Sequence, residues 1–187
     1  MPDYREAAER YRPDKIRVLF IAESPPAYAD ESKKSYFYFE QNPGSDVLFA
    51  TIIAALYGVK YRKASGTKPQ LLQRLKDDGY WLMDAVESPI NRIDDAVVKP
   101  KQRAELIRQN IPNLLKNLEA LKRARTLADS TGVILIKKVV FRMLEPELRR
   151  AGYRVLHINM VGFPGYHRDR RTIASIREAL DLQGGRR

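Results

Sequence analysis

The sequence contains no cysteine among its 187 residues, which excludes disulfides, thiolate metal sites and cysteine-bound iron–sulfur clusters. It has only two histidines, and no cluster of further metal-ligating residues accompanies them. No apolar run approaches the roughly 20 residues that cross a bilayer, and the charged N-terminal stretch MPDYREAAERYRPDK does not have the pattern of a signal peptide. We therefore expect an intracellular, cytoplasmic protein that needs no cofactor or metal and has no membrane partner.

Acidic side chains are scarce relative to basic ones. The chain has 34 Lys and Arg residues against 23 Asp and Glu residues, with a net charge of +11 and a pI near 9.9. This surplus favours polyanionic partners, nucleic acid before anionic membrane, although a basic and well-solvated surface has the same composition. The length, with 44% hydrophobic residues, is typical of one domain with a sizeable core. We expect a monomer with a single domain over residues 1–187.

Apolar runs with β-branched residues alternate with helical segments along the chain. The run from Val18 to Ala22 is uninterrupted, the pattern of a central strand buried on both faces. This alternation predicts an α/β fold, a three-layer αβα sandwich with a central four-stranded parallel sheet and right-handed crossovers. The expected strands are residues 16–22, 79–86, 132–136 and 153–159, and the expected helices are residues 3–11, 46–58, 69–78, 100–127 (broken or kinked at Pro112), 138–152 and 171–182.

Each expected strand ends in polar or charged residues. Ligands of open parallel sheets bind beyond the carboxyl ends of the strands. We therefore expect these residues to lie at one edge of the sheet and to include functional side chains. An ordinary strand–helix junction with solvated lysines is the alternative for the third strand. The strand-end residues are Glu23 and Ser24, Asp84, Lys137 and Lys138, and Asn159.

An aromatic segment, SYFYFEQNPG, follows the first expected strand. Aromatic rings beside a strand end are able to stack on a planar base. The alternative is that some of these rings fill the core beneath the loop. The rings are those of Tyr36, Phe37, Tyr38 and Phe39.

The segment GFPGYHRDRR, residues 162–171, precedes the last expected helix. Arginines near a helix start are unfavourable against its dipole unless an anion binds there, and a phosphate backbone is such an anion. Pairing with Asp169 or simple solvation is the alternative. The segment also holds His167, a better catalytic candidate than His157, which lies inside the fourth expected strand and is expected to be a hydrogen-bonded core residue. The arginines are Arg168, Arg170 and Arg171.

In this order, the segments resemble motifs of the uracil-DNA glycosylase superfamily across residues 16–182. AESPP is similar to the family's Gly-Glu-Ala-Pro-Gly variant of the motif that holds the water-activating residue, and Glu23 matches its glutamate. SYFYFEQNPGSDVLFATI resembles a Phe-x-Phe segment of the family. YWLMDAV is similar to the family's strand whose asparagine reads the uracil edge. GVILIKKVVFRML resembles the family's third strand and its Gly-Lys junction. INMVGFPGYHRDRR stands where the second motif, commonly His-Pro-Ser, enters the minor groove. The chain departs from the family at two positions: it has Ala22 where the family has a glycine, and Asp84 where the family has an asparagine. It also has no His-Pro-Ser, and it lacks the cysteines that bind the iron–sulfur cluster in the branch with the Glu motif.

The resemblance implies a monofunctional DNA glycosylase, which flips a damaged or mismatched base out of DNA and hydrolyses its N-glycosidic bond in base excision repair. It implies that Glu23 orients or deprotonates the attacking water, and that His167 or the backbone near Gly165 stabilises the departing base. The expected Glu23 strand has no lysine at its end that would argue against monofunctional chemistry. The residues implied in base binding are Ser24, Phe37, Phe39, Asp84 and Asn159, and those implied in DNA binding are Lys137, Lys138, Tyr166, Arg168, Arg170 and Arg171.

Two other functions fit the same sequence. The first is a catalytically inactive glycosylase-like module that binds nucleic acid, which Asp84 and the missing His-Pro-Ser favour. The second is a small-molecule α/β hydrolase or transferase that uses Glu23 as a base, for which the basic surface is incidental.

Overall fold

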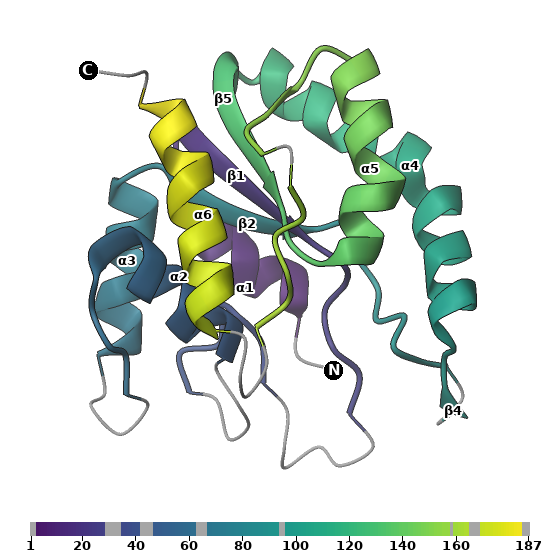
Figure 1. Ribbon diagram of the computed structural model, residues 1–187, viewed down its shortest axis with the longest axis horizontal. Coiled ribbons are helices and arrows are strands. Elements are labelled where there is room, and N and C mark those ends of the chain that lie inside the picture. The colour runs from purple at the N-terminus through teal and green to yellow at the C-terminus, as the bar shows by residue number, and fades with distance from the viewer. Residues whose placement is uncertain are drawn as a thin grey trace.

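Four parallel strands form the centre of the fold in the computed structural model (Figure 1), and their order in the sheet is β2-β1-β5-β6. The structure describes residues 3–28, 35–41, 47–62, 67–93, 96–157, 159–164 and 169–184. The strands are β1 (Ile16–Ala22), β2 (Tyr80–Asp84), β3 (Arg92–Ile93), β4 (Ala96–Val97), β5 (Leu127–Leu135) and β6 (Arg154–Val155), and the helices are α1 (Tyr4–Arg10), α2 (Val47–Tyr57), α3 (Lys68–Asp77), α4 (Pro100–Arg123), α5 (Lys138–Arg150) and α6 (Asp169–Gln183).

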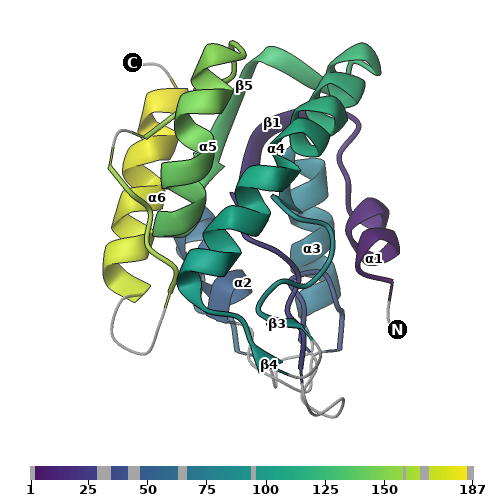
Figure 2. The same ribbon diagram turned by 90° about the vertical axis from the view of Figure 1, so that its right-hand side faces the viewer.

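The helices pack on the sheet in two groups. α2 packs against α6, and α4 packs against α5 (Figures 1 and 2). The chain leaves β1 toward β2 on one side and leaves β5 toward β6 on the other, and right-handed crossovers in opposite directions place their helices on opposite faces. The α/β class and the four-stranded parallel sheet are therefore confirmed, in an arrangement consistent with three layers. The junction of β1 and β5 is the topological switch point, where open sheets bind ligands.

The central strand β1 is buried on both faces, as expected: Val18, Leu19 and Ile21 are fully buried. It pairs with β2 on one side and with β5 on the other. None of the helices in the described part of the chain combines the length and the apolar character that crossing a bilayer requires.

The structure differs from the expected elements in several places. The helix expected over 100–127 continues through Pro112 without a break, and it ends at Arg123 because Arg125 adopts a left-handed backbone, with φ 58°. The strand expected over 153–159 is short, because the His157 imidazole, rather than a strand backbone, accepts the Leu135 N–H at 2.8 Å. The hairpin of β3 and β4 beside the start of α4 was not expected at all.

The Tyr38 side chain covers the outer edge of β2 at Leu82. The buried Tyr38 hydroxyl donates to the Leu82 carbonyl at 2.9 Å and accepts from the Leu82 N–H at 2.7 Å, so it satisfies both outward-facing backbone groups of this residue. An edge strand otherwise presents such groups unpaired. Tyr38 thus fixes the strand that ends in Asp84.

Replacing Tyr38 with phenylalanine should destabilise the fold by about 2–6 kcal/mol, because two buried backbone groups lose their partner at once and each costs roughly 1–3 kcal/mol. Urea denaturation of the variant and the parent measures the difference. Tyr153→Phe is the control, since Tyr153 is also buried, at 8% exposed against 3% for Tyr38, and no hydrogen bond of its hydroxyl occurs among the described residues. An equal loss of stability in both variants would show that the Leu82 contacts contribute nothing.

Candidate functional site at the β1–β5 switch point

Glu23 follows the last residue of β1 and lies at the switch point. Its side chain is only 9% exposed. Oε2 accepts a hydrogen bond from Lys137 Nζ and an ion-paired contact from Arg103 Nη1 at 3.4 Å. The other oxygen, Oε1, is buried and has no hydrogen-bond partner among the described residues. A buried carboxylate oxygen without a donor is costly, so this oxygen points to a donor that the described residues do not supply.

Lys137 reaches this position from the end of β5. Its backbone N–H donates to the Val161 carbonyl at 2.9 Å, and its carbonyl accepts from the Phe141 N–H in the first turn of α5 at 3.0 Å. Its φ of 88° and ψ of 138° lie in a region that residues other than glycine rarely adopt. Such a conformation costs about 1–3 kcal/mol and tends to occur at functional sites. A glycine at this position would avoid this cost. The presence of a lysine instead indicates that its side chain, which contacts Glu23, has a function here.

Arg103 was missed by the sequence analysis. It comes from the first turns of α4, on the face that also carries Ile107, which is only 1% exposed. A charged residue one turn before a buried apolar residue shares its inward face. That spacing was the available signal, but it does not say which strand end the helix covers.

The three residues Glu23, Lys137 and Arg103 form what we call the Glu23 cluster. The sequence predicted Glu23 and Lys137 separately, at the ends of two strands. The expectation that no lysine lies at the end of the Glu23 strand is wrong. Lys137 follows β5, and the pairing of β1 with β5 brings its side chain into contact with the Glu23 carboxylate.

Asp84 ends the neighbouring strand and pairs in register with Ala22. Burial raises the pKa of Asp84 to about 7, and the negative charge of Glu23 adds to this effect. A hydrogen bond from the Tyr36 hydroxyl, at 3.3 Å, opposes it. Asp84 therefore exchanges its proton near neutral pH, and it does so beside Glu23.

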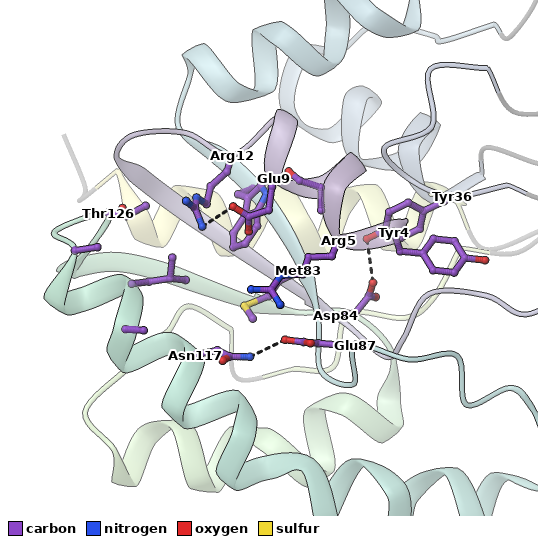
Figure 3. Close-up of a pocket in the computed structure, with 15 residues that line it drawn as sticks. Tyr4, Arg5, Glu9, Arg12, Tyr36, Met83, Asp84, Glu87, Asn117 and Thr126 are labelled. Atoms are coloured by element: carbon purple, nitrogen blue, oxygen red, sulfur yellow. Dashed lines mark hydrogen bonds and ion pairs between the residues drawn. The ribbon is translucent and has the colours of Figure 1, made fainter. Parts of the chain in front are cut away.

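Asp84 and Tyr36 lie at one end of a cavity of about 360 Å³ between α1, β2 and α4 (Figure 3). Its wall is partly apolar and partly charged: Arg12 pairs with Glu9 at 2.6 Å, and Glu87 accepts from the Asn117 amide at 2.9 Å. The remaining lining residues are Tyr4, Arg5, Ala8, Trp81, Met83, Ala120, Leu121, Ala124 and Thr126.

The two phenylalanines predicted to stack on a base do not line this cavity. Phe37 is buried and packs edge-to-face against Phe49, with ring centroids 5.4 Å apart. Phe39 is half-buried and stacks on Tyr4 at 5.6 Å. Both rings therefore fill space beneath the loop, the alternative that the sequence left open, and Tyr36 is the aromatic residue of the segment that reaches the cavity.

The other predicted base-binding residues lie outside the cavity. Ser24 Oγ accepts a weak hydrogen bond from the Ile90 N–H at 3.4 Å. Asn159 is exposed, and its carbonyl lies 2.7 Å from Nδ1 of the buried His157. This contact and the Leu135 N–H on Nε2 confirm His157 as a hydrogen-bonded core residue.

The predicted DNA-binding residues are divided between the described and the remaining parts of the chain. Lys138 is exposed in the first turn of α5, and Arg170 and Arg171 are exposed in the first turn of α6. Tyr166, His167 and Arg168 lie outside the described residues. Within the described residues, no group of His, Cys, Asp and Glu side chains is arranged to hold a metal ion.

No protein-family model, curated protein or solved structure matches this chain.

Proposed function

We propose that the protein is a DNA glycosylase that excises a damaged or mismatched base. The observation that carries this proposal is the buried Oε1 of Glu23 at the topological switch point, which has no hydrogen-bond partner among the residues that the structure describes. The resemblance of AESPP to the family's water-activating motif gives that oxygen a role, because it identifies Glu23 as the residue that binds the attacking water. The net charge of +11 supports a polyanionic substrate.

In this proposal, Glu23 holds the nucleophilic water on Oε1 and accepts its proton as the water attacks C1′ of the flipped nucleotide. The sugar acquires oxocarbenium character as the N-glycosidic bond breaks, and a carboxylate beside it stabilises that charge. Lys137 and Arg103 contact the opposite oxygen and hold the carboxylate in one orientation. Because they are cations, they also suit the phosphates that flank the flipped nucleotide.

Asp84 and Tyr36 form the base-reading end of the cavity in this proposal. With a pKa of about 7, Asp84 is present in both protonation states near neutral pH. The ionised form only accepts hydrogen bonds and suits a base with an exocyclic amine or a protonated ring, whereas the protonated form donates one to a carbonyl such as uracil O4. The Tyr36 ring supplies an aromatic surface next to that carboxyl group.

The exposed Lys138, Arg170 and Arg171 are proposed to contact phosphates, together with Tyr166 and Arg168. His167 is proposed, from the resemblance alone, to stabilise the departing base.

A panel of labelled oligonucleotides tests the proposal. Single- and double-stranded forms carry uracil, hypoxanthine, xanthine or a mismatch, and free base is quantified by chromatography while strands are resolved after alkali. Release of at least one base supports the glycosylase. A gel shift without release from any oligonucleotide would instead favour the inactive binding module, and neither would favour a small-molecule enzyme.

Asp84→Asn should raise the excision of uracil relative to amine-bearing bases. An asparagine amide offers both an acceptor and donors at every pH, so it no longer opposes the uracil O4 lone pairs, a mismatch worth about 1–3 kcal/mol. Ratios of initial rates on paired substrates at pH 6 and pH 8 measure this change. An unchanged ratio at both pH values would show that Asp84 does not read the base.

A further inference from the structure

We infer that Lys137 is a nucleophile that forms a Schiff base with abasic DNA, which gives the protein a strand-cleaving lyase activity in addition to base excision. The inference rests on the proposed function in taking DNA as the substrate and in placing Glu23 beside C1′ of the target sugar. It differs from the hydrolytic step, in which water and not an amine attacks the sugar.

The first support is the position of the amine. Lys137 Nζ lies on Glu23 Oε2, the residue that the proposal places beside C1′ of the target sugar. The lysine side chain is 28% exposed, so it is not fully enclosed by the described residues. The ring of Phe163 lies close to this amine, with Nζ 5.8 Å from its centroid, and Phe163 is 48% exposed.

The second support is the pairing of charges. A lysine must lose its proton to attack a carbonyl, and Glu23 is in direct contact to accept it. Arg103 also contacts this carboxylate, so the Lys137 ammonium is not its only counter-ion.

The third support is the backbone. The left-handed conformation at Lys137 is held by hydrogen bonds on both sides, to Val161 and from Phe141, so the side chain starts from a fixed point. A catalytic nucleophile requires such preorganisation.

The chemistry balances without a further reactant. The ring-opened abasic sugar carries an aldehyde at C1′, which Lys137 Nζ attacks; the oxygen leaves as water and a C1′=N bond remains. Glu23 removes a proton from C2′, the electrons form a C=C bond, and the C3′–O bond breaks with its pair on the phosphate oxygen. Water then hydrolyses the C1′=N bond, which returns the free amine and leaves an unsaturated aldehyde on one strand end and a phosphate on the other.

Borohydride trapping tests this inference. A duplex with one preformed abasic site is incubated with the full chain and sodium borohydride, which reduces the Schiff base to a stable amine. The expected result is a covalent protein–DNA adduct that mass spectrometry maps to Lys137. Lys137→Arg should lose the adduct, because arginine keeps the cation beside Glu23 but cannot form the imine, whereas Lys116→Arg, at an exposed lysine of α4, should keep it.

The inference is overturned if the parent forms no adduct, if Lys137→Arg still forms it, or if the modified amine is another lysine or the N-terminus. Because the substrate has no base to release, this result is independent of the oligonucleotide panel. Base release without an adduct would support the proposed function alone, and an adduct without base release would support the lyase alone.

Discussion

Glu23→Gln should lower base release on a competent oligonucleotide by about 100- to 10,000-fold, the range that removal of a general base produces. Glutamine keeps the shape of the side chain and removes its charge and its ability to accept a proton. It also turns one hydrogen-bond acceptor into a donor in a site where Lys137 and Arg103 already donate to Oε2. The best remaining arrangement places the amide nitrogen where Oε1 holds the water, which reverses the hydrogen bond that activates it.

Single-turnover kinetics with the enzyme in excess measure this effect on the chemical step. Glu105→Gln is the matched control, because Glu105 lies on α4 near Arg103 but is exposed and pairs with Arg108. Circular dichroism of both variants reports that the fold is retained. If Glu23→Gln excises the base at the rate of the parent, Glu23 is a structural ion-pair partner and the proposed mechanism is wrong.

Asp84→Asn should stabilise the fold strongly at pH 8 and very little near pH 4. Burial raises the Asp84 pKa from its ordinary value of 3.8 to about 7. Between these values the folded chain holds a proton that the unfolded chain has lost, so this residue makes stability fall as pH rises from about 4 to about 7 and adds no further loss above that. Each pH unit is worth about 1.4 kcal/mol, so the full effect is at most roughly 4 kcal/mol.

Asparagine removes the titration and keeps the size of the side chain. Urea denaturation at pH 4.5, 6 and 8 gives the difference between variant and parent, which cancels the contribution of all other titrating groups. Asp181→Asn, at an exposed position of α6, should show no such pH-dependent gain. A gain for Asp84→Asn that is the same at pH 4.5 and pH 8 would mean that Asp84 is not held protonated by its surroundings.

The sheet was predictable because its main strands have a local sequence pattern, a short apolar run. The apolar runs at 18–22 and 132–136 are buried, in β1 and at the end of β5, as expected, since a strand covered on both faces carries such a run. The short β3–β4 hairpin has no such run, and exposed Ile93 and Val97 give no alternating pattern. β6 ends early because the His157 side chain accepts the hydrogen bond of the Leu135 backbone N–H. The hydropathy of the sequence does not predict such a side-chain contact.

The candidate site was predictable only as a set of strand ends. The rule that parallel strands present polar residues at one edge brought Glu23, Asp84 and Lys137 to the same region. It did not predict which of them touch, because that depends on strand order, and Glu23 and Lys137 are separated by 114 positions. Arg103 was missed for the same reason, and Phe37 was placed in the site because a loop aromatic has the same sequence signature whether it faces a ligand or the core.

The measurement that tests the central claim most directly requires no knowledge of the damaged base. Two duplexes carry at one position either a pyrrolidine, whose ammonium resembles the oxocarbenium-like sugar, or a neutral tetrahydrofuran of the same shape, and fluorescence anisotropy gives both dissociation constants. If Glu23 Oε1 faces C1′, the parent should bind the cationic analogue at least about 10-fold more tightly, as expected of a transition-state mimic, and Glu23→Gln should abolish that preference. Equal binding of both duplexes by the parent, or the same preference in Glu23→Gln, would contradict the assignment of Glu23 as the residue that acts on the sugar.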